Sequence, residues 1–321
     1  MYYFDSPLDE EFNKYVKVVN ADIASDNLLE ELKGCEFDTI INAAAIVKHF
    51  ANDDSIERVN YGGVLNLIEV AKAHKARLIH VSTVSVAGEN IDHKFPSNFL
   101  MKENQLYFGQ DLSNKYANSK FKAEEALLDA YEKDGLDVKI IRVGNLMSRQ
   151  KDGEFQINSV TNNFMRSLKG YKVLGKFPIS SLDQYTDFSP IDETAKTILL
   201  LGQVPKKFTV FHSFNSHTVQ MGDVIDAMDL AGLHMDKVND QEFNESLKEA
   251  MADEKKSVIV STLLNYTSSD NLSHEFIQGD PSFTVKALYR LGYRWPITDF
   301  DYLIRAIKSL DSLGFFERDD M

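Results

Sequence analysis

A tyrosine and a lysine four residues apart are the first sign of chemistry in this sequence. Tyr116 and Lys120 lie in the run KYANSK, and in a helix that spacing puts both side chains on one face. A phenol can protonate a carbonyl oxygen while its carbon takes a hydride, and a nearby ammonium lowers the phenol pKa from about 10. With thirteen tyrosines in the chain, roughly one Tyr-x-x-x-Lys match is expected by chance. The elements around the pair must therefore show whether it is functional.

A hydroxyl pair ends the strand expected before this helix. Residues 77–81 (RLIHV) are apolar in the manner of a buried parallel strand, and Ser82 and Thr83 follow them. Thr83, Ser82 and Ser85 are all candidates for the hydroxyl that faces the tyrosine. The helix would be held against the sheet by an apolar stripe of Ala117, Phe121, Ala123, Leu127 and Leu128.

Strands and helices alternate along the first two thirds of the chain. We expect strands at 15–23, 38–45, 77–83, 138–143 and 209–214, with helices at 56–73, from Tyr116 and from Ile191. This order predicts an α/β fold with a parallel sheet covered on both faces. After about His217 no further strand is expected, and helices are predicted at 221–231, 243–251, 284–291 and 302–313.

Polar and small residues follow the predicted strands at the same edge of this sheet. Ligands of open α/β sheets bind beyond the carboxyl ends of the strands. Asp22, Asn42, Thr83 and Gly144 each stand at such an end. Their convergence predicts a ligand site there.

Composition excludes several classes of function. The net charge of −14 argues against nucleic-acid binding, which needs a basic surface. A single cysteine, Cys35, permits no internal disulfide and fits a reducing compartment. No signal peptide or membrane-length apolar run is seen, so a cytoplasmic setting without membrane contact is expected. The histidines lack ligand spacing, and no metal site is expected.

The motifs together resemble an extended short-chain dehydrogenase/reductase. The matching features are NAAA at 42–45, Asn60, VSTVSVAG with Thr83, YANSK with Tyr116 and Lys120, and RVGN at 142–145. More narrowly, RVGNLMSR, FSPID at 188–192 and the ending ALYRLGYRWP…YLIRAIKSLDSLGFF are similar to the C-terminal thioester reductase domain of nonribosomal peptide synthetases. The resemblance implies a Rossmann-like doubly wound domain (1–150 and 188–216) and a smaller, mainly helical substrate domain (151–187 and 217–321).

The resemblance also implies a role for each candidate residue. Tyr116 would be the general acid, Thr83 would hydrogen-bond the same oxygen, and Lys120 would also hold the nicotinamide ribose. The expected cofactor is NADPH, with NADH not excluded. Its remaining contacts would come from Asp22 near the adenine, from Asn42, Ala43 and Ala44, from the secondary candidate Asn60, and from the backbone of Gly144, Asn145 and Leu146.

The implied activity is reductive release of a thioester. The substrate would be an acyl or peptidyl group on the phosphopantetheine arm of a carrier domain, expected upstream in the same polypeptide, and the product an aldehyde or alcohol. Two alternatives stay open. One is another extended short-chain dehydrogenase, acting on sugar nucleotides or hydroxysteroids; the other is a truncated, non-catalytic binding module.

The sequence departs from the family in one large feature. The first glycine is Gly34, so the glycine-rich turn of an opening β-α-β unit is missing. In a sheet of order 3-2-1-4-5-6, the run at 15–23 would be the third strand and 38–43 the fourth. We therefore expect this chain to bind the nicotinamide cofactor weakly and to be inactive alone, because the pyrophosphate loses its usual helix amino terminus.

A basic cluster interrupts the acidic composition. Arg166, Lys169, Lys172 and Lys176 fall in a stretch that holds no acidic residue between Glu154 and Asp183. One interpretation is a docking rim for an acidic carrier domain. The other is an ordinary solvated helix end.

Overall fold

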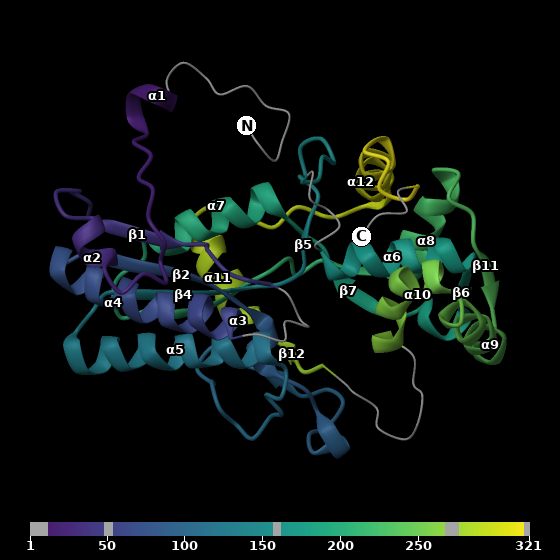
Figure 1. The fold of residues 1–321 in the computed structure, drawn as a ribbon, viewed down its shortest axis with the longest axis horizontal. Coiled ribbons are helices and arrows are strands. Elements are labelled where there is room, and N and C mark those ends of the chain that lie inside the picture. Colours follow the sequence, from purple (N-terminus) through teal and green to yellow (C-terminus); the bar gives the residue numbers. More distant parts are fainter. Residues whose placement is uncertain (1–11, 48–53, 157–161, 267–275, 318–321) are drawn as a thin grey trace.

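The computed structural model describes residues 12–47, 54–156, 162–266 and 276–317. At its centre are four parallel strands in the order β1-β2-β4-β9 (Figure 1). They are β1 (Thr39–Asn42), β2 (Arg77–Thr83), β4 (Val138–Val143) and β9 (Val210–Ser213). The predicted α/β class is confirmed, and the fold is Rossmann-like.

Helices cover both faces of this sheet. In Figure 1, α4 (Gly63–His74) and α5 (Lys115–Asp134) lie below the sheet and α7 (Ile191–Gly202) lies above it. Successive strand residues point to opposite faces: Leu78 and Ile140 pack with α4 and α5, whereas Ile79 and Ile141 pack with Leu201 of α7. The strands β2 and β4 are therefore covered on both faces and contribute to two cores.

The remaining elements near the sheet are short. The helix predicted at 56–73 consists of α3 (Ser55–Glu57), a π-helical turn η1 (Arg58–Gly62) and α4 in direct succession. The others are α1 (Phe12–Tyr15), α2 (Leu28–Glu31), the 3-10 turns η2 (Val84–Ala87) and η3 (Ile91–His93), β5 (Leu146–Met147) and β8 (Ser189–Pro190). Within the described residues, no helix is long and apolar enough to cross a membrane.

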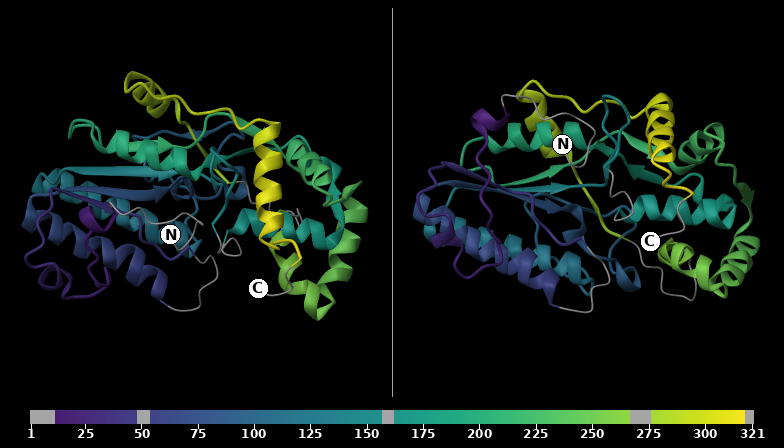
Figure 2. Two further views of the ribbon diagram at one scale, coloured as in Figure 1. Left: turned by 90° about the horizontal axis from the view of Figure 1, so that it is seen from above. Right: turned by 45° about the horizontal axis from the view of Figure 1, so that its top comes forward.

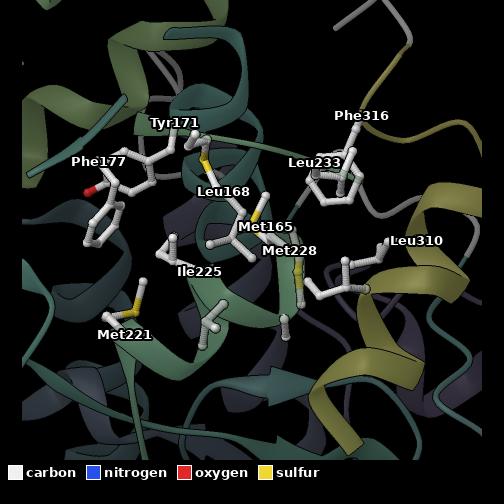
Figure 3. Close-up of a cluster of buried hydrophobic side chains, with 14 of the residues drawn as sticks. Met165, Leu168, Tyr171, Phe177, Met221, Ile225, Met228, Leu233, Leu310 and Phe316 are labelled. Atoms are coloured by element: carbon white, nitrogen blue, oxygen red, sulfur yellow. The ribbon is translucent and has the colours of Figure 1, made fainter. Parts of the chain in front are cut away.

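A second, mainly helical lobe lies beside the sheet (Figures 1 and 2). It is formed by α6 (Asn163–Leu174), α8 (Met221–Leu230), α9 (Asp240–Met251), α10 (Glu254–Val260) and α12 (Phe300–Ser312). Figure 3 shows part of its core, where Met165 and Leu168 of α6 meet Met228 of α8 and Leu310 of α12. The helices predicted in this part of the sequence are confirmed.

Short strands that were not predicted also occur beside these helices. β7 (Tyr185–Asp187) pairs with β10 (Thr218–Gln220), and β6 (Lys176–Pro178) pairs with β11 (Asp236–Val238). Each is only three residues long, so none leaves a periodic signal in the sequence. The first ladder joins the two lobes close to the sheet's carboxyl edge.

The chain returns to the sheet near its end. β12 (Gln278–Gly279) pairs with β3 (Leu100–Met101), and α11 (Ser282–Arg290) places Leu288 in the same core as Phe211 of β9. Trp295 joins that core as well. This segment differs from the expectation that all of 217–321 belongs to the substrate domain; the division into two domains otherwise remains a proposal.

The prediction of a strand at 15–23 is wrong. After α1 the chain runs without regular structure, and Tyr15 and Val18 are 70% and 82% exposed. A β-rich run becomes a strand only beside a hydrogen-bonding neighbour, and no described strand lies next to this one. Within the described residues β1 pairs with β2 on one side only and is therefore an edge strand, and its Ile41 is 46% exposed.

Candidate active site

Thr83 and Tyr116 meet at the carboxyl edge of the sheet. Thr83 is the last residue of β2, and Tyr116 lies in the first turn of α5, which begins where the Asn114 side chain accepts a hydrogen bond from the Ala117 amide (3.1 Å). The Tyr116 hydroxyl hydrogen-bonds the Thr83 side chain. Ser82 instead donates to Glu124, at 2.5 Å. The structure thus brings together the predicted hydroxyl and the predicted acid.

Lys120 lies one turn further along α5 and is buried. Its Nζ donates to the carbonyl of Val81 at 3.0 Å. Burial lowers the pKa of Lys120 to about 8, against the opposing effect of the Glu124 carboxylate. The amine is therefore charged at neutral pH and titrates within the alkaline working range of many enzymes.

The expected lowering of the tyrosine pKa is not found. Burial raises the pKa of Tyr116 to about 12, although the hydrogen bond with Thr83 acts in the opposite direction. The prediction of a more acidic phenol is therefore wrong, because desolvation outweighs the hydrogen bond that favours the phenolate. Tyr116 keeps its proton at neutral pH, as a general acid must.

Asn60 ties the loop after β1 to the catalytic helix. It lies in the π-helical turn, and its side chain accepts from the Ile46 amide (2.8 Å) and donates to the Ile46 carbonyl (3.0 Å) and to Ser119 of α5 (3.1 Å). Asn60 thus contacts the helix that carries Tyr116. π-Helical turns occur frequently at functional sites; a contact of Asn60 with the cofactor remains a prediction.

Asn42 shapes the loop that follows β1. Its side-chain oxygen accepts from the Ala44 amide (3.1 Å), while its amide contacts Nδ1 of His80 at 3.1 Å. Asn42 is buried, whereas Ala43 and Ala44 are exposed and present their small side chains at the surface. Of the predicted cofactor residues in this loop, the alanines are free to contact a ligand and Asn42 holds them in place.

His80 also lies near the site, although no sequence motif indicated it. It is buried in β2, and burial and the Lys120 charge hold its pKa well below 6.5. Because the Asn42 amide donates to Nδ1, the ring proton lies on Nε2, for which the described residues offer no partner.

The loop of Gly144, Asn145 and Leu146 is clamped by Asp187. The carboxylate of Asp187 accepts from the backbone and side-chain nitrogens of Asn145, at 2.8 and 2.9 Å, and from the Ser189 hydroxyl at 3.0 Å. Burial raises the pKa of Asp187 to about 6. A Cβ on Gly144 would lie 2.2 Å from this carboxylate, so only glycine fits. Asp187 directly precedes the FSPID motif but was not foreseen.

Asp22 stands apart from these residues. It is exposed in an irregular segment, accepts from the Ala24 amide, and lies 3.9 Å from Arg58. The strand that was to present it at the sheet edge does not form, so its contact with adenine remains a prediction without structural support.

The described residues fit one half of a nicotinamide dinucleotide. A buried amine, a phenol and a hydroxyl lie at the carboxyl edge of the sheet, where Thr83 pairs with Val143, the residue before Gly144. Among the same residues, no glycine-rich turn opens a helix at this edge to hold the pyrophosphate. No group of histidine, cysteine and acidic side chains in the described parts could hold a metal ion.

Two members of the basic cluster do not form a docking rim. Lys169 is fully buried, with its Nζ 5.6 Å from the centre of the Phe315 ring. Lys176 is paired with Glu242 at 2.9 Å. The rim prediction is wrong at these positions, because the apolar face of α6 carries Lys169 inward with it.

Known proteins resemble the chain over most of its length. A thiolation–reductase di-domain from an archaeal nonribosomal peptide synthetase is 36% identical, with a TM-score of 0.85; the match covers 98% of this chain and 66% of that one. A linear gramicidin synthase of Brevibacillus parabrevis is 26% identical over 67% of this chain. Carboxylic acid reductase of Segniliparus rugosus is 27% identical over 64% of it.

These relatives are longer proteins. The aligned region spans 4% of the gramicidin synthase and 18% of the carboxylic acid reductase. The predicted resemblance to peptide-synthetase reductase domains is confirmed by the likeness of sequence and fold. Residues 3–198 match an NAD-binding family, so the cofactor is a nicotinamide dinucleotide. The chain belongs to this family, which is described as Male sterility protein (NAD_binding_4).

Proposed function

We propose that this chain reduces an acyl or peptidyl thioester and releases it as an aldehyde. The observation that carries the proposal is the hydrogen-bonded pair of Thr83 and Tyr116 with Lys120 one turn away. Reductase and thiolation–reductase names among the relatives support this substrate class. The thioester would be presented by a phosphopantetheine-bearing carrier domain, and NADPH is the proposed donor.

The protein's part in the reaction is to protonate and to orient. The bound cofactor supplies the hydride to the thioester carbon. Tyr116, protonated because its pKa is about 12, donates to the carbonyl oxygen as negative charge develops there, and the Thr83 hydroxyl adds a second hydrogen bond. The resulting hemithioacetal then loses its C–S bond. The hydroxyl proton of the hemithioacetal returns to the Tyr116 phenolate as the carbonyl re-forms, the thiolate leaves and takes a proton from solvent, and the aldehyde is released.

Lys120 has two tasks in this scheme. Its charge lies beside Tyr116 and offsets the negative charge that the phenol acquires when it gives up its proton. Its three N–H donors can also hold the ribose of the cofactor, for which the bond to the Val81 carbonyl must be shared or exchanged. The clamp of Asp187 on Asn145 keeps the facing backbone loop in one conformation.

The test is aldehyde formation by the full chain. The chain is incubated with an acyl-pantetheine thioester and millimolar NADPH or NADH, since a glycine-rich turn is missing, and the aldehyde is trapped as a hydrazone and measured by mass spectrometry. Because cofactor binding is expected to be weak, the chain should be inactive at micromolar cofactor. At millimolar cofactor we expect product with the wild type and with Tyr131→Phe, a control on the same helix, but not with Tyr116→Phe. Calorimetric cofactor binding without any aldehyde would overturn the proposal.

A further inference from the structure

A buried ion pair lies one turn beyond Lys120. Glu124 of α5 and Arg142 of β4 are both fully buried. Arg142 donates through Nη2 (2.7 Å) and Nε (3.0 Å) to Oε2 of Glu124, and the Ser82 hydroxyl of β2 donates to Oε1 at 2.5 Å. One carboxylate therefore links the catalytic helix to both central strands.

The pair is further bonded to segments from distant parts of the chain. Arg142 donates to the Gln105 carbonyl and contacts Nε2 of His212, both at 3.0 Å. Nδ1 of His212 contacts the Asp280 carbonyl at 2.9 Å and must be its donor, so Nε2 accepts from Arg142. Burial lowers the pKa of His212 to about 3. The ring is neutral, and Glu124 and Arg142 carry the charges of this network.

A gain in stability does not readily explain why this ion pair is buried. Two charges lose their hydration when buried, and replacing a buried ion pair with apolar side chains often leaves stability unchanged or raises it. The position is more informative. Tyr116, Lys120 and Glu124 follow one another at intervals of four on one face of α5, so the carboxylate is the nearest negative charge along the helix from the catalytic amine.

We propose that Glu124 is a positioning residue for the reduction: with Arg142 it holds α5 against β2 and β4, and its carboxylate keeps Lys120 protonated beside Tyr116. This rests on the proposed function. The charged or titratable groups around Lys120 are Tyr116 and Glu124 from its own helix and His80 from β2, with Arg142 of β4 behind Glu124. Of these, Glu124 alone favours the ammonium, because His80 is neutral and Arg142 is positive.

The first experiment titrates Lys120 without cofactor or substrate. The ¹³Cε signals of the full chain, labelled with ¹³C-lysine, are followed by NMR against pH, and Lys120→Arg assigns the resonance. Glu124→Gln removes the charge at constant shape and is expected to lower the midpoint of Lys120 by about one pH unit or more. Glu124→Asp should restore most of it. Glu125→Gln, the same change at an exposed neighbour, should leave the midpoint in place.

A second variant guards against misfolding. Glu124→Gln leaves the charge of Arg142 buried without its partner. The double variant Glu124→Gln/Arg142→Met removes both charges and so leaves no unpaired charge in the core. The titration midpoint of Lys120 should also fall in this double variant. A midpoint equal to that of Glu125→Gln in the folded variants overturns the proposal.

The second experiment follows reduction against pH. In Glu124→Gln the alkaline loss of kcat should begin at lower pH, whereas a purely structural role would lower kcat equally at all pH values. An unmoved alkaline limb, in a protein whose Lys120 midpoint has moved, overturns the link to reduction. If the wild type forms no aldehyde, the proposed function fails, and the NMR midpoint still decides whether Glu124 controls Lys120.

Discussion

Replacing Lys120 with methionine should stabilise the protein while removing its activity. A pKa that falls from 10.5 to about 8 makes the buried ammonium about 3 kcal/mol less favourable in the folded protein than in the unfolded chain. Methionine fills similar space without a charge. It loses the hydrogen bond to the Val81 carbonyl, worth about 1 kcal/mol. The expected net gain at pH 7 is about 2 kcal/mol in the free energy of unfolding.

The sign of the pH dependence makes this prediction specific. Below about pH 8 both states of the wild type hold the Lys120 proton, and the full difference from Lys120→Met is present. Between pH 8 and 10.5 the folded protein releases the proton and the unfolded chain keeps it, so wild-type stability rises relative to the variant. The gain should therefore vanish by about pH 10.5.

Urea denaturation of both proteins from pH 6 to 10.5 measures this difference. Lys122→Met is the matched control, because Lys122 lies on the same helix, is 42% exposed and pairs with Glu57 at the surface. We expect the control to change stability by less than about 0.5 kcal/mol at every pH. A Lys120→Met variant no more stable than wild type at pH 7, or a gain independent of pH, would refute the reasoning.

Three further outcomes are expected. Tyr116→Phe should slow hydride transfer by about 10²–10⁴-fold in stopped-flow measurements, with cofactor affinity unchanged in calorimetry; near-normal transfer would remove Tyr116 from the mechanism. Gly144→Ala places a Cβ 2.2 Å from the Asp187 carboxylate, and should cost about 1–3 kcal/mol of stability and weaken cofactor binding; normal values for both would mean that the clamp gives way. Asn60→Ala should speed hydrogen exchange at the Ile46 amide by about tenfold or more, since that amide loses its 2.8 Å acceptor; unchanged exchange would contradict the role of Asn60 as a tie.

The sequence was most informative where a local pattern and the sheet agreed. The strands at 77–83 and 138–143 are rich in Leu, Ile and Val and lie in the middle of the sheet, and their positions bring Thr83 to Tyr116. The run at 15–23 has the same local character but no neighbour, and pairing is not encoded in the run itself. Propensity therefore predicted a strand that the structure lacks.

Burial explains the other differences. Whether Lys169 lies at the surface depends on which face of α6 packs inward, and a charge count along the sequence cannot see that. The pKa of Tyr116 likewise depends on how much water the folded site excludes, not only on the nearby lysine. The bonds from Asp187 to Asn145 and from Glu124 to Arg142 join residues far apart in the sequence, so spacing along one element could not reveal them.

The return of β12 and α11 to the sheet has a consequence for synthesis on the ribosome. All four strands of the sheet emerge before α8, α9 and α10, yet the face of β9 that Leu288 covers stays open until α11 has been made. The apolar face of β9 in the nascent sheet therefore stays exposed to solvent while the helical lobe is translated. Such late contacts slow folding and favour aggregation or chaperone binding in the interval. A chain that stops after β9 should accordingly be recovered mainly in inclusion bodies or bound to chaperones.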